Sequence, residues 1–192
     1  VGQTVVTGIF DKGPGRGMLW TYRNRVVMAN TGERVCDLDG ASMARGHGGF
    51  GGDKGDPPAR LAIPERPADI VCDIATLPQA ALLYRLSGDF NAVHASPPVA
   101  RQAGFDAPIL HGRCTFGVAG HAILRHCCDY DAARMTAMSA QFTSPVFPGE
   151  TVRTEIWRDR AVPARVVFRA SVPARGVVVL DRGHATVAAA DA

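Results

Sequence analysis

Residues 148–156 have the sequence PGETVRTEI, and residues 1–9 have the similar sequence VGQTVVTGI. Gly, Thr, Val, Thr and Ile match in register, and Gln stands opposite Glu. Each segment continues through a charged turn into an apolar segment typical of a strand, at residues 18–22 and 166–170, and then into another, at residues 33–45 and 177–187. Because internal repeats set the architecture of a chain, we predict two related units.

The second unit contains elements that the first lacks. Residues 113–126 (RCTFGVAGHAILRH) are apolar on most sides, which is typical of a buried helix. Residues 78–86 also have helical propensity, and residues 134–143 resemble a strand. In residues 151–157, Val152, Thr154 and Ile156 alternate with charged side chains, which indicates a half-buried strand. We therefore predict that each unit is a long helix wrapped by antiparallel strands, and that the first unit lacks its helix and opening strand.

Gly and Pro dominate the stretch between the two copies, GHGGFGGDKGDPPARLAIPERP at residues 46–67. Such composition favours a linker or an extended covering loop. The predicted organisation is a remnant of the first unit at residues 1–46, a linker at 47–76 and a complete second unit at 77–192.

Charge and cysteine content exclude several function classes. The net charge is only +3, from 21 basic and 18 acidic residues that are scattered along the chain, which argues against nucleic-acid binding. No apolar run approaches the roughly 20 residues that cross a bilayer. The five cysteines show no zinc-ligand spacing, so we expect free thiols in a reducing compartment and no metal site.

Two short motifs carry the candidate chemistry. In residues 84–94 (YRLSGDFNAVH) a helical segment ends at Ser-Gly, and Asp89, Asn91 and His94 then follow close together. Gly112 stands immediately before the buried helix, where unpaired N–H groups and partial positive charge can stabilise an oxyanion. A carboxylate and an imidazole can activate one water between them. These groups suit water addition to an α,β-unsaturated thioester, which needs no metal or redox cofactor.

Each of these residue types also has an ordinary structural explanation. Asp89 and Asn91 are common in Asx-turns, His94 can pack in a core, and Gly112 can ease a tight turn. The spacing alone does not decide between these interpretations. For His111, the sequence suggests a role in positioning the turn before Gly112 rather than a direct chemical role.

The chain resembles the MaoC-like, R-specific enoyl-CoA hydratases, including the hydratase region of peroxisomal multifunctional enzyme type two. The resemblance lies in the segments YRLSGDFNAVH, AGFDAPILHGRCTFG and FTSPVFPGETVRTEIW, preceded by DKGPG and GGFGG. It implies an α+β double hot-dog fold, in which an antiparallel sheet wraps around a long central helix. The C-terminal repeat of that family carries the catalytic residues, and the N-terminal repeat shapes the acyl pocket.

The resemblance also implies roles for individual residues. Asp89 and His94 match the catalytic acid/base pair, Asn91 matches a residue that assists them, and Gly112 matches the N–H donor of the oxyanion hole. The residues implied at the substrate and CoA site are Lys12, Phe90, Ala92, Val93 and Phe142. The chain departs from the family where Ala92 and Val93 replace Pro-Leu and where Arg113 replaces Leu.

The resulting hypothesis is reversible hydration of trans-2-enoyl-CoA to (R)-3-hydroxyacyl-CoA, a hydro-lyase activity of fatty acid metabolism. The CoA thioester is the substrate, and no cofactor is expected. Two alternatives remain: a hot-dog acyl-CoA thioesterase, and a catalytically inactive acyl-CoA-binding subunit. We expect a homodimer with no nucleic-acid or membrane partner, in the cytoplasm, or in the peroxisome if the source is eukaryotic.

Overall fold

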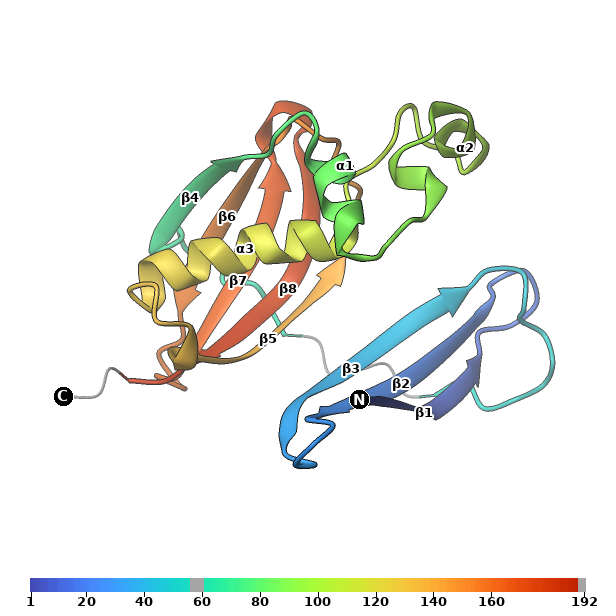
Figure 1. Ribbon diagram of the computed structural model, residues 1–192, viewed down its shortest axis with the longest axis horizontal. Coiled ribbons are helices and arrows are strands. Elements are labelled where there is room, and N and C mark those ends of the chain that lie inside the picture. The colour runs from blue at the N-terminus through green and yellow to red at the C-terminus, as the bar shows by residue number, and fades with distance from the viewer. Residues whose placement is uncertain (56–60, 190–192) are drawn as a thin grey trace. The chain divides into compact units, whose positions relative to one another are not determined.

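The computed structural model describes residues 1–55 and 61–189. The chain consists of two compact units, Val1–Ala59 and Arg60–Ala192 (Figure 1). Among the described residues, no helix is long and apolar enough to cross a membrane.

The first unit is a three-stranded antiparallel sheet in the order β1-β2-β3. Its strands are β1 (Gly2–Asp11), β2 (Met18–Val27) and β3 (Arg34–Ala44). They confirm the three strand predictions for this part of the sequence, and residues 1–55 contain no helix. The ion pair between Arg23 and Asp39 joins directly opposite positions of β2 and β3. Because both side chains are exposed, the ion pair adds little to the free energy of unfolding. Its opposite charges do favour the observed register between β2 and β3.

A buried carboxylate fixes the Gly-rich segment that follows β3. Asp11, at the end of β1, accepts hydrogen bonds from the backbone N–H groups of Gly13, Gly49 and Gly51 at 2.8, 2.7 and 2.7 Å. These amides hold the pKa of Asp11 below its ordinary value because they stabilise the charged form. Gly48 comes so close to Gly13 that an added Cβ would lie 2.3 Å from the Gly13 carbonyl oxygen. Asp11 thus joins the DKGPG and GGFGG motifs into one structure.

The second unit is a five-stranded antiparallel sheet in the order β4-β6-β7-β8-β5, with the long helix α3 along one face (Figure 1). Its helices and strands are β4 (Ile70–Ala75), α1 (Ala80–Tyr84), α2 (Pro97–Gln102), α3 (Gly112–Cys127), β5 (Met135–Phe142), β6 (Thr151–Arg158), β7 (Arg165–Val172) and β8 (Val177–Val187). The layout is that of a hot-dog unit, in which the sheet wraps a central helix.

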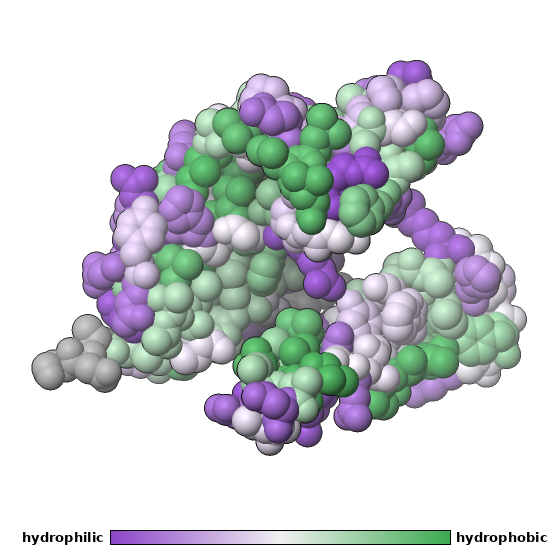
Figure 2. All heavy atoms as spheres, viewed as in Figure 1, coloured by the Kyte–Doolittle hydropathy of each residue, from purple (hydrophilic) through white to green (hydrophobic). Residues whose placement is uncertain are grey.

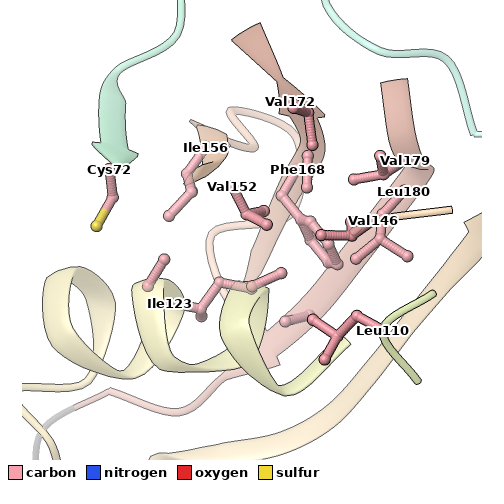
Figure 3. Packing of buried hydrophobic residues seen from close by; sticks show 14 of the residues in the cluster. Cys72, Leu110, Ile123, Val146, Val152, Ile156, Phe168, Val172, Val179 and Leu180 are labelled. Carbon is pink, nitrogen blue, oxygen red and sulfur yellow. The ribbon is translucent and has the colours of Figure 1, made fainter. Parts of the chain in front are cut away.

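The core of this unit lies between α3 and the sheet. Ile123 of α3 points toward Ile156, Phe168 and Leu180 of the sheet, and all four side chains are buried (Figure 3). Phe168 lies so close to Gly183 on β8 that a Cβ there would be 2.5 Å from the ring. The absence of a side chain at Gly183 therefore makes room for the largest fully buried residue of the core.

The two strongest periodicity predictions are confirmed. The helix predicted at residues 113–126 is α3, which runs one residue further in each direction. In β6, Val152, Thr154 and Ile156 are buried, as their alternation predicted.

Three other segments differ from the sequence-based expectation. The predicted helix at residues 78–86 is only five residues of α-helix, followed by the 3-10 turn η1 (Arg85–Ser87). Residues 70–75, which fall inside the predicted linker 47–76, form the edge strand β4, because Cys72 and its apolar neighbours pack against the core cluster. The short helix α2 was not predicted. The division into a first-repeat remnant, a linker and a complete unit stays a prediction.

Candidate functional site

The loop that carries the candidate acid and base is shaped by its own side chains. Gly88 ends η1 with a φ of 107°, a left-handed conformation that favours glycine. Asp89 Oδ1 then accepts the Asn91 N–H at 3.2 Å, and Asn91 Oδ1 accepts the Val93 N–H at 3.2 Å. The Asx-turn interpretation therefore holds for both residues. It leaves the second carboxylate oxygen of Asp89 and the Asn91 amide nitrogen without a hydrogen-bond partner among the described residues.

His94 closes this loop with a defined tautomer. It ends the 3-10 turn η2 (Ala92–His94), and only 9% of its surface is exposed. Its Nδ1 lies 2.8 Å from the carbonyl oxygen of Ile109. Because a carbonyl oxygen only accepts, Nδ1 carries the proton in the neutral ring, and Nε2 keeps its lone pair. His94 is thus oriented as a base that accepts a proton through Nε2.

His111 lies directly against His94. The two rings stack with centroids 3.7 Å apart and planes 24° apart. His111 is 1% exposed, and its Nε2 lies 3.2 Å from the backbone oxygen of Asp89. Burial lowers the pKa of His111, and the nearby His94 adds to this effect. The sequence assigned His111 only to the turn before Gly112; its adjacency to that glycine was the one available signal.

Asp89, His94 and His111 converge. One ligand-type atom from each side chain lies within 4.8 Å of the other two. Two imidazoles and a carboxylate are a common metal-binding set. Stacked, nearly parallel rings, however, direct their nitrogens side by side rather than toward one ion, and one nitrogen of each ring already faces a carbonyl. The arrangement suits a shared water better than a metal ion.

Gly112 opens α3 next to this cluster. As the first residue of the helix its N–H has no intrahelical acceptor, and none of the described residues accepts it. The ring of Phe142, which is 52% exposed, lies beside it: a Cβ added at Gly112 would be 3.2 Å from Phe142 Cε1. The structure thus places the Phe142 ring beside the N-terminus of α3.

A pocket of about 330 Å³ opens onto His94. It is lined by Pro78, Ala81, Leu82, His94, Ala95, Ala107, Pro108, Phe147 and Pro148. Hydrophobic side chains gather on the surface over α1 and η1 (Figure 2): Leu82 and Leu83 of α1 are about half exposed, and Leu86 of η1 is more exposed. The surroundings of the imidazole therefore suit an apolar ligand. A larger pocket of about 430 Å³, between residues 61–63 and the β7–β8 strands, contains none of the predicted site residues.

The remaining predicted substrate residues are placed less specifically. Phe90 is exposed, and the guanidinium carbon of Arg85 lies 5.5 Å from its ring centroid. Ala92 and Val93 form η2 together with His94. Lys12 belongs to the first unit, where its ammonium group donates to the Lys54 carbonyl and lies 5.6 Å from the Phe10 ring centroid. It is not among the groups that the second unit brings together.

Comparison with known proteins identifies relatives of the whole chain. A family model described as "MaoC like domain" matches residues 60–179. The chain is 45% identical over 185 residues to 3-hydroxyacyl-thioester dehydratase Y of Mycobacterium tuberculosis, covering 94% of this chain and 63% of that protein. It is 35% identical over 189 residues to the probable enoyl-CoA hydratase 2 of Dictyostelium discoideum, covering 97% of this chain and 63% of that protein. The chain therefore spans somewhat less than two thirds of these relatives.

Solved structures agree with this result. The MaoC-like dehydratase from Phytophthora capsici superposes with a TM-score of 0.89 at 38% identity, covering 100% of this chain and 65% of that structure. The predicted α+β double hot-dog fold is thereby confirmed. The chain belongs to the MaoC-like dehydratase family.

Proposed function

We propose that this chain catalyses the reversible hydration of trans-2-enoyl-CoA to (R)-3-hydroxyacyl-CoA. The observation that carries the proposal is the convergence of the Asp89 carboxylate and the His94 imidazole next to the helix that begins at Gly112. The names of the relatives, a 3-hydroxyacyl-thioester dehydratase and an enoyl-CoA hydratase 2, describe the two directions of one such reaction.

In the proposed reaction a water lies between Asp89 and His94. His94 Nε2 takes a proton from this water, because Nδ1 is already occupied by the Ile109 carbonyl. The Asp89 carboxylate accepts a hydrogen bond from the other hydrogen, which stays on the oxygen, and orients the oxygen lone pair toward C3 of the substrate. As the C–O bond forms at C3, the electrons of the double bond move to the thioester oxygen.

The Gly112 N–H stabilises the enolate oxygen that develops in this step. Protonation of C2 by the protonated acid/base pair then completes the addition of one water, and both groups return to their starting state. Asn91 assists by donating from its amide nitrogen, since its oxygen is held by the Val93 N–H. Phe142 borders the path of the thioester, and the pocket at His94 supplies apolar surroundings.

The test is the loss of ultraviolet absorbance of an enoyl-CoA thioester with purified protein, measured for Asp89→Asn and His94→Gln. Loss of a general acid or base lowers the rate about 10²- to 10⁴-fold, and we expect a fall in this range for each variant. Asp131→Asn is the matched control for the first, because Asp131, like Asp89, accepts a hydrogen bond from the backbone N–H two residues further along the chain. His126→Gln, on the exposed last turn of α3, is the control for the second.

Full activity in Asp89→Asn or in His94→Gln would refute the assignment. Release of free thiol from a saturated acyl-CoA would favour a thioesterase instead, and calorimetric binding of acyl-CoA without any turnover would favour an inactive binding subunit. Homodimerisation remains part of the proposal, and sedimentation of the purified protein tests it.

A further inference from the structure

The ring of His111 makes three contacts that all concern the proposed acid/base pair or its loop. It stacks on His94, it lies 4.7 Å from the ring centroid of Tyr84, and its Nε2 faces the Asp89 carbonyl. Since that carbonyl only accepts, His111 Nε2 carries a proton and donates. His111 Nδ1 is then an unprotonated acceptor, and it is buried with no partner among the described residues.

An unpartnered acceptor in a buried position is unfavourable, and an apolar side chain would avoid this cost. If packing were the only task of position 111, an apolar side chain would therefore be more favourable there than histidine. What a phenyl ring cannot do is donate to the Asp89 carbonyl. The presence of histidine at this position points to that donated hydrogen bond as the useful property.

The charge state of His111 fits the same role. Besides His94, the charged groups that face it are Asp89 and Arg85, and desolvation is the largest influence on its pKa, which it lowers. His111 thus stays neutral when its stacked neighbour gains a proton. A second charged imidazole 3.7 Å away would oppose that protonation.

We propose that His111 is a positioning residue of the hydration site, which fixes the plane of the His94 ring by stacking and the Asp89 backbone by its Nε2–H. One side chain thereby sets the separation between the base and the carboxylate that share the water. The inference rests on the proposed hydratase function, but it adds a residue that neither touches the substrate nor exchanges a proton with it.

Three substitutions separate the two contacts. His111→Phe keeps a ring for stacking and loses the donor, His111→Gln keeps an N–H donor and loses the ring, and His111→Ala loses both. Because a small misplacement of reacting groups costs up to about 10²-fold in rate, we expect kcat to fall about 10- to 100-fold in the Phe and Gln variants, and further in the Ala variant. KM and the affinity for a saturated acyl-CoA should stay near the wild-type values. His126→Phe and His126→Gln, on the exposed last turn of α3, are the controls and should change neither constant.

A purely structural role would lower the fraction of active enzyme and the melting temperature together. It would not lower kcat in a variant with wild-type thermal stability and ligand affinity. The inference is overturned if His111→Phe keeps both its melting temperature and its kcat. The ¹⁵N chemical shifts of the ring supply a second measurement that needs no variant: we expect the neutral Nε2–H tautomer for His111 at pH 7. A charged ring or the Nδ1–H tautomer overturns the proposal even if the variants do not fold.

The outcome also distinguishes this inference from the proposed function. If Asp89→Asn abolishes hydration while His111→Phe keeps full kcat, the hydratase assignment stands and the positioning role fails. If Asp89→Asn is fully active, both fail.

Discussion

Replacement of Gly112 by alanine separates the chemistry of the helix N-terminus from its stability. The new Cβ would lie 3.2 and 3.4 Å from two carbons of the Phe142 ring. Ordinary carbon contacts are about 3.5–4.0 Å, so the ring must move by a few tenths of an ångström. Since Phe142 is half exposed, it can move at little cost.

The helix itself gains from the change. Alanine is more favourable than glycine in a helix by up to about 1 kcal/mol, which corresponds to about 2–4 °C in a chain of this size. We therefore expect the melting temperature of Gly112→Ala to equal that of the wild type or to exceed it by a few degrees.

The activity should change in the opposite direction. An oxyanion must approach its donor to about 2.7–3.1 Å, and removal of one such donor costs about 10²–10³ in kcat. A methyl group beside the Gly112 N–H, together with a displaced Phe142, obstructs this approach, so we expect a fall of about 10²-fold in kcat/KM.

Gly117→Ala is the matched control, because Gly117 lies on an exposed turn of the same helix and an added Cβ there meets nothing within 4 Å. It should gain up to about 1 kcal/mol in stability, as expected inside a helix, and keep full activity. Enoyl-CoA absorbance and circular dichroism melting measure both properties. A Gly112→Ala enzyme with wild-type kcat/KM would refute the reasoning, as would an equal loss of activity in Gly117→Ala.

Three further predictions concern the core, the pH dependence and the absence of a metal requirement. Gly183→Ala forces a methyl group against the buried Phe168 ring, so we expect the free energy of unfolding, measured in urea, to fall by about 1–3 kcal/mol. Combining Gly183→Ala with Phe168→Leu should recover part of this loss. If the losses of the two single variants simply add in the double variant, the two residues are not in contact. Hydrogen bonds from Arg66 lower the pKa of Asp69 to about 2, so its contribution to stability is complete above the ordinary value of 3.8 and is lost as the pH falls toward 2. Asp69→Asn should flatten the fall of the unfolding free energy across this interval, and an unchanged pH profile would show that the pair has no influence. Because the two imidazoles at the site stack and one nitrogen of each faces a carbonyl oxygen, EDTA should leave the hydration rate unchanged, and a loss that added zinc restores would contradict this geometry.

The sequence predicted the parts of the fold that depend on local periodicity. The helix α3 and the strand β6 follow from side chains a few positions apart, and both lie within one or two residues of the expected bounds. The strand β4 could not be predicted from the sequence, because it is short and follows a Pro-rich stretch. Its strand conformation depends chiefly on pairing with β6, which is distant in the sequence.

The sequence predicted which residues form the candidate site, but it did not predict how their side chains are oriented toward one another. The grouping of Asp89 and His94 came from their spacing and from the family resemblance, and the structure brings them together. The stack of His94 on His111 could not be predicted, since it depends on two loops 17 positions apart meeting in space. The Asp89 backbone oxygen that accepts from His111 was equally hidden, because a backbone carbonyl is present at every position and leaves no signature in the sequence.

The hydrogen bonds around Asp11 have a consequence for protein engineering. The Asp11 carboxylate accepts hydrogen bonds from the N–H of Gly13, two positions away, and from the N–H of Gly49, 38 positions away. We therefore expect that the turn after Asp11 and the Gly-rich loop must be transferred together when this part of the chain is exchanged with that of a relative. A chimera that imports the loop without its aspartate would leave these amides to the solvent, whereas a chimera that transfers the two pieces jointly should retain the native conformation.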